Sequence, residues 1–200
     1  MESGPFAWTA LRWQRHSQHR LPLEYKAPPE YGTKRKMFHV AAQSPAGKSE
    51  LYTALREQLA SLLEGERDSV ANAANMASLL YHALPDVNWA GFYFFQGREL
   101  VLGPFQGKPA CVRIPIGSGV CGTAAGRRES LVVPDVNLFP GHIACDSASR
   151  SELVVPLIRD GVLLGVLDMD SPTPGRFDDA DRLGAETLAA VYVEAIGAGA

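Results

Sequence analysis

The sequence contains no long apolar run. A membrane-spanning helix needs about 20 consecutive apolar residues, and every apolar stretch in this 200-residue chain is shorter. The N-terminus also lacks the apolar core of a secretory signal, although its arginine-rich, acid-poor composition fits an organelle transit peptide as well. We therefore expect no membrane contact and a cytoplasmic location, with import into an organelle as the alternative that stays open.

Cysteine is scarce, with three residues in the chain. An odd number of cysteines without an export signal argues against a disulfide framework and predicts reduced thiols in a reducing compartment. None of the three belongs to a close C-x2-C pair, which is the spacing that structural zinc sites usually have. A zinc site made of the three thiols and His142 therefore stays only as an alternative.

No large excess of either charge is present, since the net charge is −3. This gives no indication of a surface for nucleic acid or for a membrane. The charge is unevenly distributed: residues 1–48 carry eight Lys or Arg against three acids, a net +5, which leaves −8 for residues 49–200. With five prolines and no sustained apolar period, residues 1–48 are expected to be a poorly ordered basic extension. The alternative is a true start at Met37, which would leave the residues before it outside the protein. Residues 49–200 are long enough to form one domain with a full hydrophobic core.

The apolar spacing from residue 49 onward predicts an α+β domain. Helical periodicity predicts helices over 51–65, 68–84 and 178–196, and a glycine-rich segment at 117–125 predicts the start of a short helix. Short apolar or aromatic runs predict strands at 88–95, 99–102, 112–115, 131–133, 154–159 and 162–168. Because short turns join these runs, we expect a mostly antiparallel central sheet, with helices packed on one face and loops covering a pocket on the other.

The cysteines all fall in predicted loops or at element ends. Cys145 lies in a small, polar stretch at 141–152 that leads into a buried strand, and a thiol placed there is expected to face a cavity. Thiol redox chemistry needs a nucleophilic thiolate and a second thiol that converts its sulfenic acid to a disulfide. Cys111, Cys121 and Cys145 can supply both, and three unrelated buried thiols are the alternative interpretation of the spacing.

Three carboxylates are expected to gather at one end of the sheet. Asp168 and Asp170 lie two residues apart at the end of a predicted strand, so they project from the same face, and Glu152 opens the partner strand. A carboxylate that follows an apolar run is costly unless it meets a cation or a ligand. Neighbouring acids also raise at least one pKa, which suits a proton donor. A plain turn role for Asp170 and a divalent metal site are the alternatives.

An aromatic pair is predicted on the same strand. Trp89 and Tyr93 lie four residues apart and therefore on one face. Aromatic faces bind methyl-sulfur groups and cations well, while ordinary core packing is the alternative.

Together these motifs resemble the free methionine-(R)-sulfoxide reductases, enzymes built on a single GAF-type domain. The resemblance covers roughly residues 49–197, includes all three cysteines, and leaves residues 1–48 outside. It is carried by the segments Asn88–Tyr93, Gly107–Cys111, Gly119–Gly122, Phe139–Asp146, Ser151–Glu152 and Gly165–Ser171.

The resemblance implies reduction of free methionine-(R)-sulfoxide in a nearly closed pocket, without a metal or an organic cofactor. The methyl-sulfur end of the substrate would pack against Trp89 and near Tyr93. Its ammonium would be held by carboxylates among Glu152, Asp168 and Asp170, and an acid of this group, Glu152 or Asp170, would protonate the sulfoxide oxygen.

The resemblance also implies roles for the thiols. Cys145 is preferred as the thiolate that attacks the sulfoxide, because the backbone of the serine-rich stretch that follows it could stabilise the charge, and Cys121 is the alternative. Cys111 would then close a disulfide with Cys145, which thioredoxin and the NADPH system would reduce.

Two other functions stay open from the sequence. A GAF domain can sense a small ligand, although such sensors usually accompany an output domain, for which 200 residues leave little room. A thiol-based peroxidase or peroxide sensor would use the same cysteines but would not need the acids or the aromatic pair. A homodimer through terminal helices is a further expectation.

Overall fold

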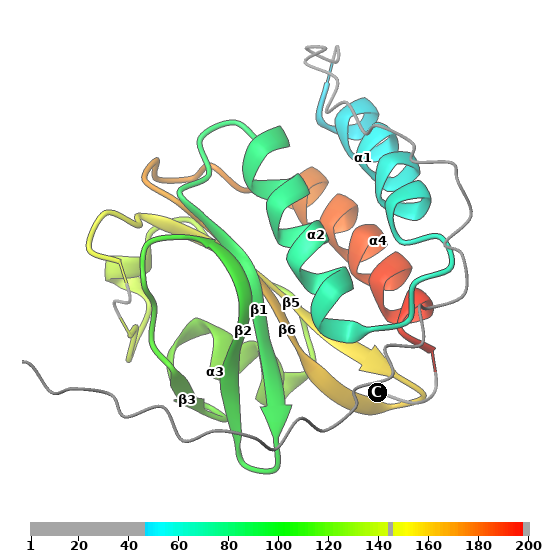
Figure 1. The fold of residues 1–200 in the computed structure, drawn as a ribbon. Helices are drawn as coiled ribbons and strands as arrows, with labels where there is room; N and C mark the ends of the chain where they lie inside the picture. Colours follow the sequence, from blue (N-terminus) through cyan, green and yellow to red (C-terminus); the bar gives the residue numbers. More distant parts are fainter. Residues whose placement is uncertain (1–46, 144–145, 198–200) are drawn as a thin grey trace, which may run out of the picture. The chain divides into compact units, whose positions relative to one another are not determined.

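The computed structural model describes residues 47–143 and 146–197. Six strands form one sheet in the order β3-β2-β1-β6-β5-β4, and every neighbouring pair is antiparallel. Figure 1 shows the central strands of this sheet beside the helices. The strands are β1 (Trp89–Gln96), β2 (Glu99–Gly107), β3 (Arg113–Pro115), β4 (Leu131–Val133), β5 (Ser151–Arg159) and β6 (Val162–Ser171). The α+β class and the antiparallel sheet predicted from the sequence are confirmed.

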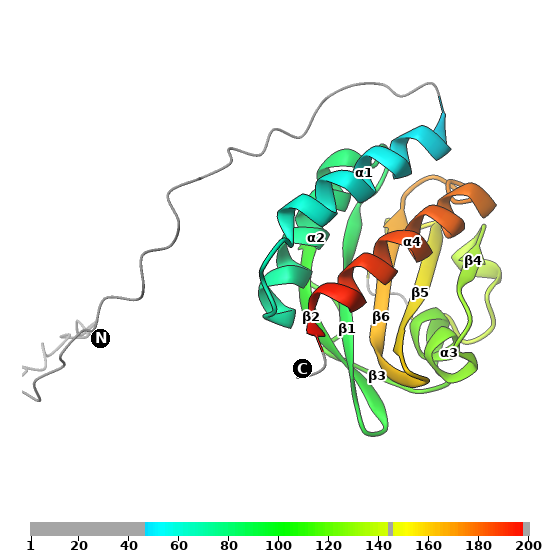
Figure 2. The same ribbon diagram turned by 90° about the vertical axis from the view of Figure 1, so that its right-hand side faces the viewer.

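Helices cover both faces of the sheet, unequally. Three helices, α1 (Lys48–Leu62), α2 (Ser69–Ala83) and α4 (Asp179–Ala195), share one apolar core with one face of the sheet. Figure 2 shows these helices in front of the strands. The short helix α3 (Gly119–Arg127) and the loops share a second core with the other face. Loops were expected on this second face, and the structure adds the short helix α3 to them. No helix in the described ranges is long and apolar enough to cross a bilayer.

Local sequence signals explain the ends of the long helices. Asp68 caps α2 by accepting a hydrogen bond from the backbone N–H of Ala71 at 2.8 Å, as the sequence predicted. Asp178 and Asp181 form a reciprocal capping box at the start of α4. Asp181 is fully buried and also accepts hydrogen bonds from Lys48, Tyr52 and Arg176, which attach α1 to α4. This polar network lies far from the face that α3 covers.

The hairpin of β5 and β6 determines which side chains share a face. Asp160 (φ 49°) and Gly161 (φ 77°) both adopt the left-handed backbone that a two-residue turn requires, as the Asp-Gly pair predicted. Trp89 on β1 lies opposite Asp170 on β6, which in turn lies opposite Glu152 on β5. One row across three strands therefore carries an aromatic side chain and two acids.

Several element boundaries differ from the sequence-based prediction, and one element is added. β5 begins at Ser151, so the polar stretch predicted as a loop over 141–152 loses its last two residues to the sheet. β2 extends to Gly107, and an unexpected 3-10 turn spans Val136–Leu138. The predicted extension over residues 1–48 lies outside the described residues except for its last two.

Candidate active site

Three carboxylates meet on the α3 side of the sheet. Asp168 and Asp170 project from β6 toward that side, and Glu152 projects there from β5, where it pairs with Asp170. Glu152 and Asp168 are each only 6% exposed. The sequence-based prediction of clustered acids at this end of the sheet is thus met by the register of the strands.

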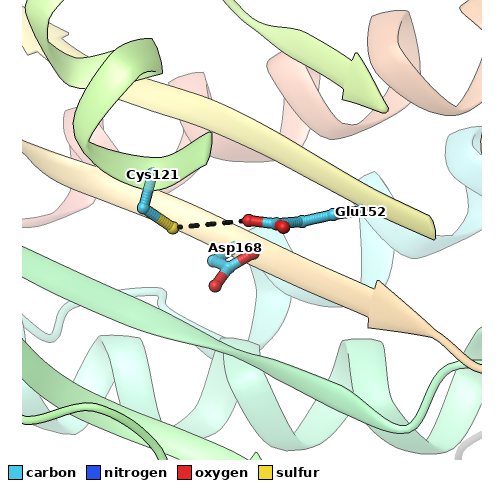
Figure 3. Close-up of side chains that lie close together, drawn as sticks. All are labelled: Cys121, Glu152 and Asp168. Carbon is cyan, nitrogen blue, oxygen red and sulfur yellow. Dashed lines mark hydrogen bonds between the residues drawn. The ribbon is translucent and has the colours of Figure 1, made fainter. Parts of the chain in front are cut away.

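Helix α3 brings a thiol to the acids. Cys121 lies in its first turn and is buried, and its Sγ donates a hydrogen bond to Glu152 Oε1 at 3.7 Å (Figure 3). The thiol and one oxygen each of Glu152 and Asp168 lie within 4.8 Å of one another. Gly122 permits this close approach, because a Cβ at that position would overlap the carbonyl oxygen of Pro115.

Burial makes this cluster hold protons. Desolvation raises the pKa of Asp168 to about 7, in spite of hydrogen bonds that act in the opposite direction. Burial, and then the charges of neighbouring acids, raise the pKa values of Glu152 and Asp170 well above their ordinary range. Burial first, and then Asp168 and Glu152, likewise raise the pKa of the Cys121 thiol. At neutral pH the cluster therefore carries less negative charge than three exposed carboxylates would.

Asp168 carries a further sign of an absent partner. Its Oδ1 is buried and accepts no hydrogen bond from the residues that the structure describes. A buried carboxylate oxygen without a partner is costly, and functional sites are where such atoms are retained. A donor or a cation brought by a ligand would satisfy this oxygen.

Aromatic rings line the hollows beside the acid cluster. Trp89 stacks on Tyr93, with ring centroids 5.9 Å apart, and on Phe105 of β2 at 5.3 Å. The indole N–H of Trp89 donates a hydrogen bond to the carbonyl oxygen of Lys108 at 3.1 Å, which fixes the ring plane. Gly91 lies between Trp89 and Tyr93 in β1, and a Cβ there would come within 2.7 Å of the indole of Trp89. Phe105 was not identified from the sequence, because its strand was predicted to end at residue 102.

The loop after the 3-10 turn closes the site. Asp146 accepts hydrogen bonds from the backbone N–H of Ala148 at 2.9 Å, from Asn88 at 3.3 Å and from Lys108 at 3.2 Å. These bonds tie the loop to β1 and to the segment after β2. The backbone bond to Ala148, followed by the bond from Lys108, lowers the pKa of Asp146. His142 points into the site, with Nε2 3.8 Å from Glu152 Oε2.

Two adjoining hollows form the site. They have empty volumes of about 390 and 220 Å³, and Tyr93, Asp146, Asp168 and Asp170 line both. A larger open groove of about 1710 Å³ lies between α4 and β5. We place the chemistry in the smaller hollows, because they contain the buried thiol, the acids with raised pKa values and the unpartnered oxygen.

Of the eight site residues predicted from the sequence, the structure brings six together: Trp89, Tyr93, Cys121, Glu152, Asp168 and Asp170. Cys111 is partly buried against the same core, between β2 and β3. Cys145 lies outside the described residues, so its role as nucleophile and its disulfide with Cys111 stay predictions. Asn88 and Asp146 lie in motifs noted in the sequence, but their function in holding the loop was not predicted.

Comparison with known proteins identifies a matching family model and similar proteins of known name. The GAF domain model matches residues 49–196. The free methionine-R-sulfoxide reductase of Escherichia coli (strain K12) is 52% identical over 143 residues, which are 72% of this chain and 87% of that protein. The enzyme of the same name from Saccharomyces cerevisiae is 47% identical over 159 residues, 76% of this chain and 88% of that protein.

A solved structure matches as well. The free methionine-R-sulfoxide reductase from Neisseria meningitidis, in complex with its substrate, has a TM-score of 0.74 and 45% sequence identity. The match covers 80% of this chain and 94% of that one. The chain therefore belongs to the GAF domain family and, within it, to the family of free methionine-R-sulfoxide reductases.

Proposed function

We propose that this protein reduces free methionine-R-sulfoxide to methionine with cysteine thiols. The observation that carries the proposal is the buried acid cluster, which lies between an aromatic wall and a thiol and has an unsatisfied carboxylate oxygen. Relatives of that name at 52% and 47% identity support the same reaction.

The acids select the free amino acid. The substrate ammonium is held among Glu152, Asp168 and Asp170, and its charge favours their ionised forms, so that binding releases protons from the cluster. The methyl-sulfur end packs against Trp89 and Tyr93. A methionine residue within a peptide has no ammonium and would leave the buried carboxylates without a partner. The proposed substrate class is therefore free methionine sulfoxide and excludes the protein-bound residue.

Two thiols carry the redox change. The thiolate of Cys145 attacks the sulfoxide sulfur, and a carboxylic acid, Glu152 or Asp170, donates a proton to the sulfoxide oxygen. The oxygen passes to the cysteine, which becomes a sulfenic acid, and methionine leaves. The thiol of Cys111 then displaces the oxygen as water and closes a disulfide. The overall reaction converts one sulfoxide and two thiols to one sulfide, one disulfide and one water.

The position of Cys121 favours Cys145 as the nucleophile. Burial and the neighbouring acids raise the pKa of the Cys121 thiol, so its thiolate is scarce at neutral pH. Its bond to Glu152 suits a proton donor to that carboxylate better than an attacking group. The disulfide is reduced by thioredoxin in the cytoplasm, and NADPH supplies the electrons through thioredoxin reductase. The reaction needs no metal or organic cofactor.

A coupled assay tests the proposal. Purified protein with thioredoxin, thioredoxin reductase and NADPH is challenged separately with free methionine-R-sulfoxide, with the S form, and with a peptide that contains methionine sulfoxide. NADPH consumption is expected with the free R form only. Turnover of the peptide at a comparable rate would refute the ammonium account, and no turnover of any sulfoxide would refute the reaction.

Two matched variants test the order of the thiols. Cys145→Ser is expected to abolish turnover, whereas Cys121→Ser is expected to retain part of it. The opposite ranking would assign the attack to Cys121.

A further inference from the structure

The acid and thiol groups also have the geometry of a metal site. Cys121 Sγ, one oxygen of Glu152 and one oxygen of Asp168 lie within 4.8 Å of one another, and Sγ and Glu152 Oε1 are 3.7 Å apart. At zinc–sulfur and zinc–oxygen bond lengths of about 2.3 and 2.0–2.2 Å, the ligand atoms of a tetrahedral site are about 3.3–3.8 Å apart. The pair of Cys121 Sγ and Glu152 Oε1 already has this spacing. The Asp168 oxygen would reach it if its distances to these two atoms shortened from at most 4.8 Å.

The unpartnered oxygen of Asp168 is an independent sign of a missing cation. Asp168 is 6% exposed, and it lines both hollows of the site. Within ranges 47–143 and 146–197, its Oδ1 has no hydrogen-bond partner. The residues described as lining these hollows include no lysine or arginine. Lys108 pairs instead with Asp146 on the loop and is mostly exposed. A bound cation would supply the partner that no lysine or arginine of these hollows provides to Asp168.

The donor set indicates which cation fits. A thiolate and two carboxylates match the preferences of zinc and cadmium, whereas magnesium and calcium favour sites with oxygen ligands only. His142 Nε2 lies 3.8 Å from Glu152 Oε2 and provides a nearby imidazole for the fourth position. The thiolate and the two carboxylates carry a charge of −3 when ionised. A divalent ion would reduce this charge to −1.

We propose that the reduced protein binds one thiophilic divalent cation, Zn²⁺ or Cd²⁺, through Cys121, Glu152 and Asp168. The ion acts as an inhibitor and not as a cofactor, because it occupies the carboxylates that hold the substrate ammonium. This competition rests on the proposed function, whereas the binding itself does not.

The binding experiment uses the full chain with the other two thiols removed. The Cys111→Ser/Cys145→Ser variant, reduced and free of chelator, is titrated with Zn²⁺ by calorimetry and with Cd²⁺ by the ultraviolet absorption of the cadmium–thiolate bond. One equivalent is expected to bind. Adding Cys121→Ser is expected to remove the cadmium–thiolate absorption and to weaken Zn²⁺ binding at least about tenfold. Undiminished binding in this triple variant, or no binding in the double variant, would overturn the proposal.

A second variant guards against a packing effect of the serine. Asp168→Asn keeps the shape of the side chain and all the thiols of the background, and it is expected to weaken Zn²⁺ binding by a similar factor. Circular dichroism melts identify any variant that does not fold. Zn²⁺ affinity unchanged in a folded Asp168→Asn variant would remove Asp168 from the site and refute the assignment.

Competition with an amino acid separates the two proposals. Free methionine is expected to raise the apparent Kd for Zn²⁺, whereas glycine, which chelates zinc in solution in the same way, is expected to do so much less. Zinc binding without a methionine effect would overturn the competition. If the wild-type protein has no reductase activity in the coupled assay but Zn²⁺ still binds at Cys121, the proposed function is refuted and the metal site is retained.

Discussion

The buried carboxylate of Asp168 is expected to lower the free energy of unfolding of this protein. Its pKa rises from an ordinary 3.8 to about 7 on folding, because burial disfavours the charged form. A difference of about 3 pH units corresponds to about 4 kcal/mol of folding free energy at about 1.4 kcal/mol per unit. Asp168→Asn removes this penalty but weakens the hydrogen bonds that the carboxylate accepts, so we expect a net gain of about 2–4 kcal/mol at pH 8.

The sign of the pH dependence follows from the direction of the shift. Between pH 4 and pH 7 the folded protein holds a proton on Asp168 that the unfolded chain has released. Stability therefore falls as the pH rises through this range, and the penalty is complete above the folded pKa of about 7. The advantage of Asp168→Asn should be near zero at pH 4 and largest at pH 8.

Thermal and urea unfolding of the reduced proteins, with a chelator present, measure the effect. A gain of 2–4 kcal/mol corresponds to about 5–10 °C in Tm for a domain of this size. Asp146→Asn is the matched control in the same cavity. Its backbone bond to Ala148 lowers its pKa, so this variant should lose stability at pH 8. An Asp168→Asn variant that is less stable than the wild type at pH 8 would refute the reasoning.

Three further predictions concern the packing of Gly91 and Gly184 and the charge of Asp178. Gly91→Ala forces a methyl group against the indole of Trp89, so we expect a loss of about 1–3 kcal/mol in urea unfolding and a raised KM. Gly184→Ala overlaps the ring of Tyr52 between α1 and α4, so a similar loss of stability with an unchanged KM is expected. An unchanged KM in the first variant, or a raised one in the second, would contradict the placement of the site. Asp178 has a folded pKa of about 2, chiefly because a lysine of α1 donates a hydrogen bond to it, so its contribution is present above pH 4 and lost toward pH 2. The stability difference between Asp178→Asn and the wild type should therefore vanish near pH 2, and a difference that grows on acidification would contradict the shift.

Local chemistry made much of the fold predictable from the sequence. The cap at Asp68 and the turn at Asp160 and Gly161 each depend on a few neighbouring residues, and both are confirmed. The shared face of Asp168 and Asp170 follows from the two-residue period of a strand, so the clustering of acids was also accessible.

The parts that were missed depend on pairing between distant segments. Phe105 reaches the aromatic wall only because β2 continues to Gly107, beyond the point where its apolar pattern weakens. The position of α3 over the acids depends on how Gly122 packs against Pro115, which no periodicity encodes. For the same reason, the sequence could name Cys121 as a candidate but could not predict its bond to Glu152.

The row from Trp89 through Asp170 to Glu152 also limits how this protein can evolve. Alternate residues of β6 face opposite sides of the sheet, and Leu167 and Met169 lie in the core shared with the long helices. Inserting or deleting one residue between the turn at Gly161 and Asp168 would exchange these two sets and place carboxylates in the apolar core. Length changes in the lineage of this chain should therefore collect in loops and termini, while β6 changes by substitution only.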